Sequence, residues 1–197
     1  MSDRIAVIGA GQMGNGIAHV FAQSGLEVTM VDVADAALAK ARDTIAKNLD
    51  RQIKKGTITG DEKAAVLGRV TTSTSMEAIA GAALVVEAAA EHRDLKFRIF
   101  TEMDAKADAG AILATNTSSI SITEIAARTR RPEQVIGMHF MNPVPVMQLV
   151  EIIRGLATSD ATTAPTTTSR SPSTWTSSST SWGGPSRESG FPKKMSS

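Results

Sequence analysis

Six residues near the start of the chain, Gly9-Ala10-Gly11-Gln12-Met13-Gly14, restrict its fold more than any other feature. Three glycines at this spacing arise by chance in many sequences. Here, however, they follow the apolar run Ile5–Ile8 directly and precede a segment with Ile17, Val20 and Phe21 at helical spacing. A strand, a glycine-rich turn and a helix in immediate succession indicate a turn at which the backbone approaches a ligand closely.

Each glycine of this turn has a task that a side chain would obstruct. Gly9 permits the tight turn after the strand, Gly11 lets the backbone approach a pyrophosphate, and Gly14 lets the helix pack close to the strand. The start of the helix adds unpaired N–H groups and a partial positive charge. The turn is therefore predicted to bind the phosphates of a dinucleotide.

An acidic residue follows the second strand candidate. Asp32 comes directly after Glu27–Val31, at the distance that dinucleotide-binding sequences use, about 20 residues past the glycines. A carboxylate there accepts hydrogen bonds from the adenosine ribose and repels a 2′-phosphate, which favours NAD over NADP. The alternative is a structural glycine-rich turn followed by an aspartate placed by chance.

Strand candidates and helix-period segments alternate up to about Leu156. Five of the six strand candidates are nearly continuous apolar runs, which is typical of parallel strands covered on both faces. The alternation predicts an α/β fold of the Rossmann type, a doubly wound and mostly parallel sheet. The strand candidates are Arg4–Ile8, Glu27–Val31, Leu84–Ala88, Ala111–Thr115, Val135–His139 and Leu149–Ile153. The helix signals are the spacing of Leu38, Ala41, Ile45, Leu49 and Ile53, and a capping box at Ser121 and Glu124.

The composition changes abruptly after Leu156. No Leu, Ile or Val follows it, and just over half of residues 161–197 are Ser or Thr. Such a segment buries too little apolar surface to offset its ordering entropy. We therefore predict an NAD-binding domain over residues 1–160 and a disordered tail over 161–197. A frameshifted or artificial C-terminus explains the change more simply than a glycosylated Ser/Thr stalk, because nothing before it indicates export.

Charge and composition exclude several classes of protein. The formal net charge is +1, so no overall field favours nucleic acid or an anionic membrane as partner. No apolar run approaches the roughly 20 residues that span a bilayer, and no signal peptide is recognisable, so we expect a cytoplasmic protein. The absence of cysteine removes disulfides, thiolate zinc sites and thiol nucleophiles. We expect no metal site.

One histidine lies where a catalytic base could act. His139 is the only histidine at the carboxyl end of a predicted strand, the edge where ligands bind in open α/β sheets. The prolines of Asn142-Pro143-Val144-Pro145 fix a stiff turn that could bring Glu151 back beside the imidazole. A carboxylate there would select the tautomer and stabilise the imidazolium. Alternatively, His139 is an ordinary core or surface residue, and Glu151 lies on an exposed strand face.

Three stretches of the chain resemble the 3-hydroxyacyl-CoA dehydrogenase family, especially its bacterial 3-hydroxybutyryl-CoA members. They are Ile8–Ala18, Ala114–Ile120 and Gly137–Glu151. The likeness covers roughly the first 160 residues. In the family, a helical C-terminal domain follows, with a further active-site Asn and most of the homodimer interface. Neither is expected in this sequence.

The resemblance implies roles for the matching residues. His139 would be the general base and Glu151 its orienting partner, while Ser118 and Asn142 would lie near the reacting oxygen of the substrate. Lys55 would contact CoA. Another family position beside the CoA site, which is usually Ser, corresponds to Asn48 in this sequence. The implied cofactor-binding residues are Gly9, Ala10, Gly11, Gln12, Met13, Gly14, Asp32, Glu91, Lys96 and Asn116. Alternatively, Ser118 belongs only to a turn, and Lys55 to a solvated helix face.

The function predicted on this basis is NAD-dependent oxidation of an (S)-3-hydroxyacyl-CoA, such as 3-hydroxybutyryl-CoA, to the 3-ketoacyl-CoA in fatty-acid or butanoate metabolism. Two alternatives stay open. One is a sibling dehydrogenase that acts on another hydroxy acid, and the other is a truncated NAD-binding module without catalysis. We expect the chain as written to bind NADH but to turn over acyl-CoA poorly.

Overall fold

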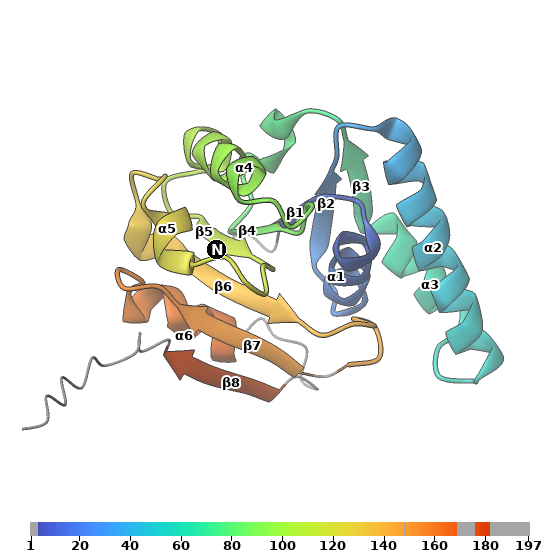
Figure 1. Cartoon of the computed structure of the whole chain (residues 1–197). Coiled ribbons are helices and arrows are strands. Elements are labelled where there is room, and N and C mark those ends of the chain that lie inside the picture. The colour runs from blue at the N-terminus through green and yellow to red at the C-terminus, as the bar shows by residue number, and fades with distance from the viewer. Residues whose placement is uncertain (1–3, 148, 169–175, 182–197) are drawn as a thin grey trace, which may run out of the picture.

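The computed structural model describes residues 4–147, 149–168 and 176–181. Their strands form one sheet in the order β3-β2-β1-β4-β5-β6-β7-β8 (Figure 1). The strands from β3 to β6 are parallel, β7 is antiparallel to β6, and β8 is parallel to β7. The strands are β1 (Arg4–Ile8), β2 (Glu27–Val31), β3 (Val70–Ser73), β4 (Leu84–Glu87), β5 (Ile112–Thr115), β6 (Val135–Phe140), β7 (Leu149–Arg154) and β8 (Thr176–Ser181).

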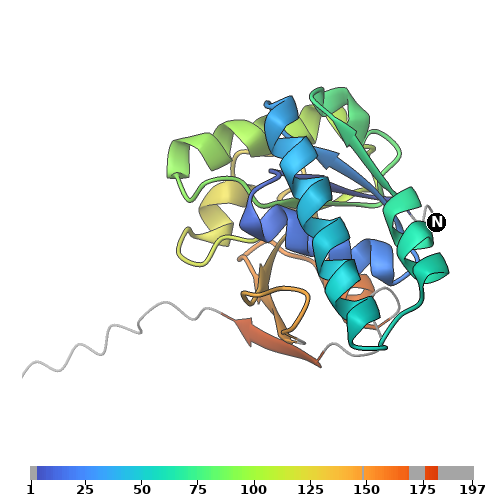
Figure 2. The same ribbon diagram turned by 90° about the vertical axis from the view of Figure 1, so that its right-hand side faces the viewer.

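Helices cover both faces of this sheet, with α1, α2 and α3 on one face and α4 and α5 on the other (Figures 1 and 2). Among the described residues, no helix is both long and apolar enough to cross a membrane. The helices are α1 (Gln12–Gln23), α2 (Asp35–Lys54), α3 (Gly60–Gly68), α4 (Arg93–Lys106), α5 (Ile122–Ala126) and α6 (Asp160–Thr168), with short 3-10 helices η1 (Met76–Ile79) and η2 (Pro132–Gln134).

Each face of the sheet has its own apolar core, because successive side chains of a strand point to opposite faces. In β1, Ile5 and Val7 pack into the cluster beneath α1 and α2, whereas Ala6 and Ile8 pack into the cluster beneath α4 and α5. This double burial is why the strands are continuous apolar runs. The predicted α/β fold with a mostly parallel sheet is confirmed, and each of the six predicted strands ends within one residue of its observed bounds.

The first strand missing from the predicted set is β3, which forms one edge of the sheet. Only Val70 of its four residues is buried, and the others are Thr or Ser. Its place depends on backbone pairing with β2. Such a short polar edge strand has almost no apolar periodicity to detect.

The predicted tail also contains regular structure. Asp160–Thr168 forms α6, and the backbone of Thr176–Ser181 pairs with β7 as β8. The boundary predicted at residue 160 therefore falls at the start of a helix. The Ser/Thr composition concealed this helix because hydroxyl groups can bind backbone atoms: Thr162 Oγ1 donates to the Glu133 carbonyl at 2.8 Å. Residues 169–175 and 182–197 of the predicted tail lie outside the described residues.

Helix α1 buries an imidazole, which gives a testable pH dependence. His19 is 0% exposed, and among the described residues neither ring nitrogen has a hydrogen-bond partner. Burial lowers the pKa of His19 from 6.5 to about 4, and nearby Gln23 opposes the shift only in part. The unfolded chain therefore binds a proton at a higher pH than the folded chain does, so stability is lost as the pH falls from about 6.5 towards 4.

We expect His19→Leu to remove this dependence, because leucine fills a similar volume and does not titrate. Denaturant unfolding at pH 6.5 and at about pH 4.5 should show the wild type losing roughly 2 kcal/mol more than the variant over that interval. Equal losses in the two proteins would show that the charged form of His19 is accommodated in the folded state.

Candidate active site

The turn after β1 has the backbone geometry that a phosphate-binding loop needs. Gly9 has a φ of +99°, and a Cβ on it would lie 2.7 Å from the carbonyl oxygen of Ala88. A Cβ on Gly14 would lie 1.8 Å from the carbonyl oxygen of Gly9. A Cβ on Gly11, in contrast, would meet nothing within 4 Å. The loop is therefore packed tightly against the protein at both ends and open at its centre.

The helix that follows begins without a side-chain cap. Gly11 occupies the N-cap position, and the first turn of α1 contains no acidic residue. The first N–H groups of a helix have no partner within the helix, so here they are available to an anion. Residues Gly9–Gly14, including the exposed Gln12 and the half-buried Met13, thus fit the pyrophosphate of a dinucleotide.

The Asp32 carboxylate binds the backbone of the phosphate loop and of the segment after β2. Its Oδ2 accepts a hydrogen bond from the Ala10 N–H at 2.8 Å, and its Oδ1 accepts one from the Ala34 N–H at 3.1 Å. A carboxylate has about four acceptor positions, so two bonds to the backbone leave room for ribose hydroxyls. Asp32 is suited both to hold the loop and to receive the adenosine end of a cofactor.

Two substitutions separate these tasks. Asp32→Asn should narrow the preference for NADH over NADPH, because it keeps an acceptor but removes the charge that repels a 2′-phosphate. Asp32→Ala should also weaken NADH binding, by a few kcal/mol at most, because both the loop contact and the ribose acceptor are lost. Fluorescence titration with both cofactors measures these effects. Equal affinity for NADH and NADPH in the unaltered protein would contradict the assignment.

His139 and Glu151 meet across the antiparallel pair formed by β6 and β7. The register places the two residues opposite each other, and His139 Nδ1 lies 2.9 Å from Glu151 Oε2. Their side chains are 25% and 34% exposed. When Glu151 Oε2 accepts a hydrogen bond from Nδ1–H, the lone pair of the neutral imidazole lies on Nε2. This is the arrangement of a general base with an orienting carboxylate.

The loop between these two strands rests on helix α1. Gln12 Nε2 donates to Asn142 Oδ1 at 3.1 Å, and a Cβ on Gly16 would lie 2.8 Å from the Cβ of buried Val144. The phosphate loop and the loop that carries Asn142 are thus held by the same helix.

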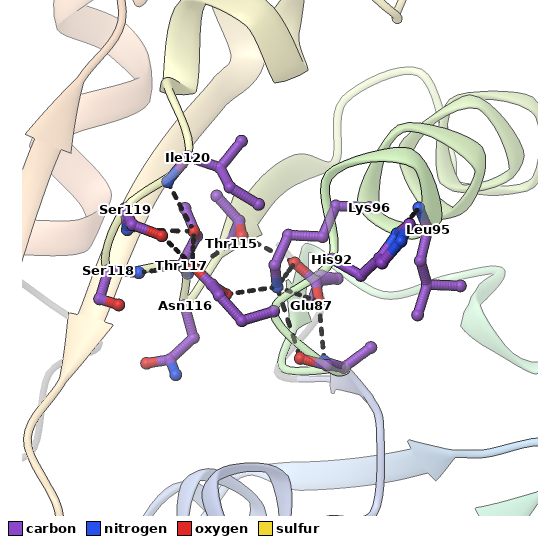
Figure 3. A network of polar contacts seen from close by, with 12 residues as sticks. Glu87, His92, Leu95, Lys96, Thr115, Asn116, Thr117, Ser118, Ser119 and Ile120 are labelled. Carbon is purple, nitrogen blue, oxygen red and sulfur yellow. Dashed lines mark hydrogen bonds and ion pairs between the residues drawn. The ribbon is translucent and has the colours of Figure 1, made fainter.

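A buried ion pair lies at the end of β4 (Figure 3). Lys96 Nζ donates to the two carboxylate oxygens of Glu87 at 2.7 and 2.9 Å, and both residues are at most 1% exposed. Thr115 Oγ1 and the Ala89 N–H also donate to Glu87, each at 2.7 Å. One buried carboxylate thereby joins α4, β4, β5 and the loop after β4.

Glu91 extends this cluster towards the surface. Its Oε2 lies 3.3 Å from Lys96 Nζ, and its Oε1 accepts bonds from the Thr117 hydroxyl, the Ser119 hydroxyl at 2.9 Å and the Ser118 N–H at 3.2 Å. Partial burial raises the pKa of Glu91, but the Thr117 and Ser119 hydrogen bonds and the Lys96 charge outweigh it, and the pKa lies below its ordinary value. Glu91 is therefore ionised near neutral pH.

Most of the predicted site residues lie on the loops at the carboxyl ends of the strands, and Lys55 lies apart from them. Asn116 Oδ1 accepts a hydrogen bond from the Phe140 N–H at 2.9 Å, so the strand edge that carries His139 joins the loop that carries Ser118. Lys55 is exposed at the C-terminal end of α2, and within the described part of the chain its side chain makes no hydrogen bond or ion pair with the other predicted residues. Across the described ranges, no three His, Cys, Asp or Glu side chains are grouped to hold a metal ion.

Glu87 is the main residue that the sequence did not reveal as part of the site, along with Thr115, Thr117 and Ser119. Its signal was present: a carboxylate ends the apolar run Leu84-Val85-Val86, and a buried carboxylate requires a cation or several donors. The partner, Lys96, lies on the following helix, so neither residue indicates the other by spacing.

The profile of one protein family, described as "3-hydroxyacyl-CoA dehydrogenase, NAD binding domain", matches residues 4–170. This chain belongs to that family. Its sheet and phosphate loop form the NAD-binding domain of a 3-hydroxyacyl-CoA dehydrogenase, and the predicted family and cofactor are confirmed.

Several 3-hydroxyacyl-CoA dehydrogenases are similar in sequence to this chain over the NAD-binding domain. The 3-hydroxybutyryl-CoA dehydrogenase of Bradyrhizobium diazoefficiens is 50% identical over 159 residues, which cover 81% of this chain and 54% of that protein. The 3-hydroxyadipyl-CoA dehydrogenase of Escherichia coli is 44% identical over 79% of this chain and 33% of its own length. The chain spans about half the length, 54–59%, of the first 3-hydroxybutyryl-CoA relatives that it matches.

A solved structure shows the same architecture. The crystal structure of (S)-3-hydroxybutyryl-CoA dehydrogenase PaaH1 from Ralstonia eutropha superposes with a TM-score of 0.89 at 46% identity. The match covers 92% of this chain and 64% of that one.

Proposed function

We propose that this chain supplies the NAD-binding and proton-accepting part of an enzyme that oxidises an (S)-3-hydroxyacyl-CoA to a 3-ketoacyl-CoA. The observation that carries the proposal is the contact between His139 Nδ1 and Glu151 Oε2 at 2.9 Å, because it leaves Nε2 as a proton acceptor on a strand whose following loop contacts Gln12 of the phosphate-binding loop. The names of relatives up to 50% identical support 3-hydroxybutyryl-CoA as a substrate.

Oxidation of a secondary alcohol removes a proton from the hydroxyl group and a hydride from the same carbon. NAD, when bound, accepts the hydride. His139 Nε2 takes the hydroxyl proton, and the Glu151 carboxylate stabilises the imidazolium that forms. Ser118 and Asn142 are proposed to donate hydrogen bonds to the substrate oxygen while it carries partial negative charge.

The remaining proposed contacts divide between cofactor and substrate. Gly9–Gly14 and Asp32 are proposed to hold the diphosphate and adenosine parts of NAD, and Glu91, Lys96 and Asn116 the nicotinamide part. Lys55 is proposed to pair with a phosphate of CoA. The comparisons restrict the identity of the acyl group less, since relatives carry the names of both 3-hydroxybutyryl-CoA and 3-hydroxyadipyl-CoA dehydrogenases.

A second candidate is an NAD-binding module without catalysis, and the observation that favours it is the exposure of the candidate base. Catalysis needs the substrate held in attack geometry within a cleft that excludes water. The candidate base His139 keeps 25% of its side chain exposed, so the described residues alone do not enclose it.

We expect a polypeptide of these 197 residues to bind NADH and to reduce acetoacetyl-CoA poorly or not at all. Cofactor fluorescence measures the binding, and absorbance of NADH during incubation with acetoacetyl-CoA measures turnover, with His139→Gln as the background control. Rapid reduction that depends on His139 would show that these residues complete the site. Binding of NADH without turnover supports the second candidate for this polypeptide.

A further inference from the structure

The strand order determines which half of a dinucleotide lies over which strands. In a doubly wound sheet the cofactor binds across the carboxyl edge where the strand order reverses, and here the reversal lies between β1 and β4. Asp32 at the end of β2 marks the adenosine side. The nicotinamide half therefore falls on the side of β4, β5 and β6, which carries Glu87, Glu91 and His139. Close packing of Gly9 against the Ala88 carbonyl places the loop after β4 beside the phosphate loop.

The charges of the cluster on this side do not cancel. Lys96 is one cation between two carboxylates, and both of its shorter contacts, at 2.7 and 2.9 Å, go to Glu87. Its contact with Glu91 is longer, at 3.3 Å. With all three groups ionised, the sum of the three charges is −1. Lys96 and Glu87 are buried, whereas the Glu91 side chain is 40% exposed, so Glu91 is the member of the cluster that a ligand can reach.

We infer that Glu87 and Lys96 are positioning residues for Glu91 in a cluster with a net charge of −1, and that this charge raises the affinity of the site for the oxidised cofactor relative to the reduced one. The nicotinamide ring of NAD+ carries a positive charge, whereas that of NADH is neutral. A fixed negative charge on that side of the site therefore lowers the free energy of the NAD+ complex alone. The inference deepens the proposed function and rests on it for the placement of the nicotinamide half.

Alternative roles for the cluster predict different binding behaviour. If Glu91 only formed a hydrogen bond to the ribose or ordered its loop, its loss would weaken NAD+ and NADH equally. An electrostatic role changes the ratio of the two dissociation constants. ADP-ribose lacks the nicotinamide ring, so it reports on the rest of the site and should not respond to the charge of Glu91.

The test is calorimetric titration of the complete chain with NAD+, NADH and ADP-ribose. Glu91→Gln should raise the ratio Kd(NAD+)/Kd(NADH) by about 3- to 10-fold, and Glu91→Lys should raise it further in the same direction. The Kd for ADP-ribose should stay within about twofold, since these substitutions change only the charge on the nicotinamide side. Glu102→Gln is the matched control, because it makes the same chemical change at an exposed position of α4, and its ratio should equal that of the wild type.

Glu87→Gln tests the positioning role separately. With Glu87 neutral, Lys96 compensates Glu91, so the ratio should rise as it does in Glu91→Gln although Glu91 is intact. Removing one partner of a buried pair is strongly destabilising. If this variant does not fold, the Glu91 substitutions alone decide the inference.

Two outcomes overturn the inference. One is an unchanged ratio Kd(NAD+)/Kd(NADH) in the Glu91 variants, which includes equal weakening of NAD+ and NADH, and the other is a parallel loss of ADP-ribose binding. Because no measurement requires turnover, these affinities decide the inference whether or not this polypeptide has dehydrogenase activity, whereas failure of the unaltered chain to bind either cofactor would contradict the proposed function.

Discussion

Replacement of His139 by Gln is expected to lower the turnover number by about 10²–10⁴-fold, measured in a form of the protein that turns over. Glutamine keeps a polar side chain on β6 but cannot accept the hydroxyl proton as imidazole does. The affinity for NADH should change little, because the loss is confined to the chemical step. Stopped-flow kinetics and NADH titration of the same preparation measure the two quantities.

Two further substitutions test the pairing on which this prediction rests. Glu151→Gln should also lower turnover, by a smaller factor, because the amide oxygen can still accept the Nδ1 proton but no longer stabilises the imidazolium. Glu133→Gln is a matched control. This exposed residue of η2 lies at the amino end of β6, away from the carboxyl end that carries His139, so its turnover number should equal that of the unaltered protein. Near-normal turnover in His139→Gln would show that another group is the base.

The second large effect is expected at Gly14. A Cβ at this position would lie 1.8 Å from the Gly9 carbonyl oxygen, so the Gly14→Ala variant can fold only if the loop or the helix moves. We expect a loss of roughly 3 kcal/mol or more in folding stability, which corresponds to a fall in Tm of about 10 °C. NADH binding should be lost even at temperatures where the variant is folded.

Gly11→Ala provides the matched comparison, because the same added methyl group meets no protein atom within 4 Å. Its folding stability should change by less than about 0.5 kcal/mol. NADH affinity should nevertheless fall, since the methyl group occupies space through which the pyrophosphate approaches the backbone. If Gly11→Ala binds NADH as tightly as the wild type, the pyrophosphate does not lie against Gly11.

The sequence was most informative where one segment carries the whole signal. The strand β1, the turn Gly9–Gly14 and the start of α1 are contiguous, so their order alone predicted the phosphate loop. His139 and Glu151 also lie on one hairpin, and the prolines between them indicated the return of the chain. In both cases the structure brings together residues that are close in sequence.

The Glu87 cluster shows why other parts were not predicted. Glu87, Lys96 and Thr115 come from β4, α4 and β5, and only tertiary packing brings them within hydrogen-bond distance. The composition did not reveal α6 for a different reason. The argument counted the apolar surface that Ser and Thr cannot bury, but not the backbone carbonyl of Glu133, to which the Thr162 hydroxyl donates.

The hairpin formed by β6 and β7 has an evolutionary consequence. His139 and Glu151 are cross-strand partners in it, so their contact depends on the register of two adjacent strands rather than on the remainder of the domain. A slip of one residue would turn Glu151 to the other face of the sheet. The proposed proton-accepting pair can therefore be inherited, duplicated or lost as one short segment. The cluster of Glu87, Glu91 and Lys96, in contrast, is distributed over β4, the loop that follows it and α4.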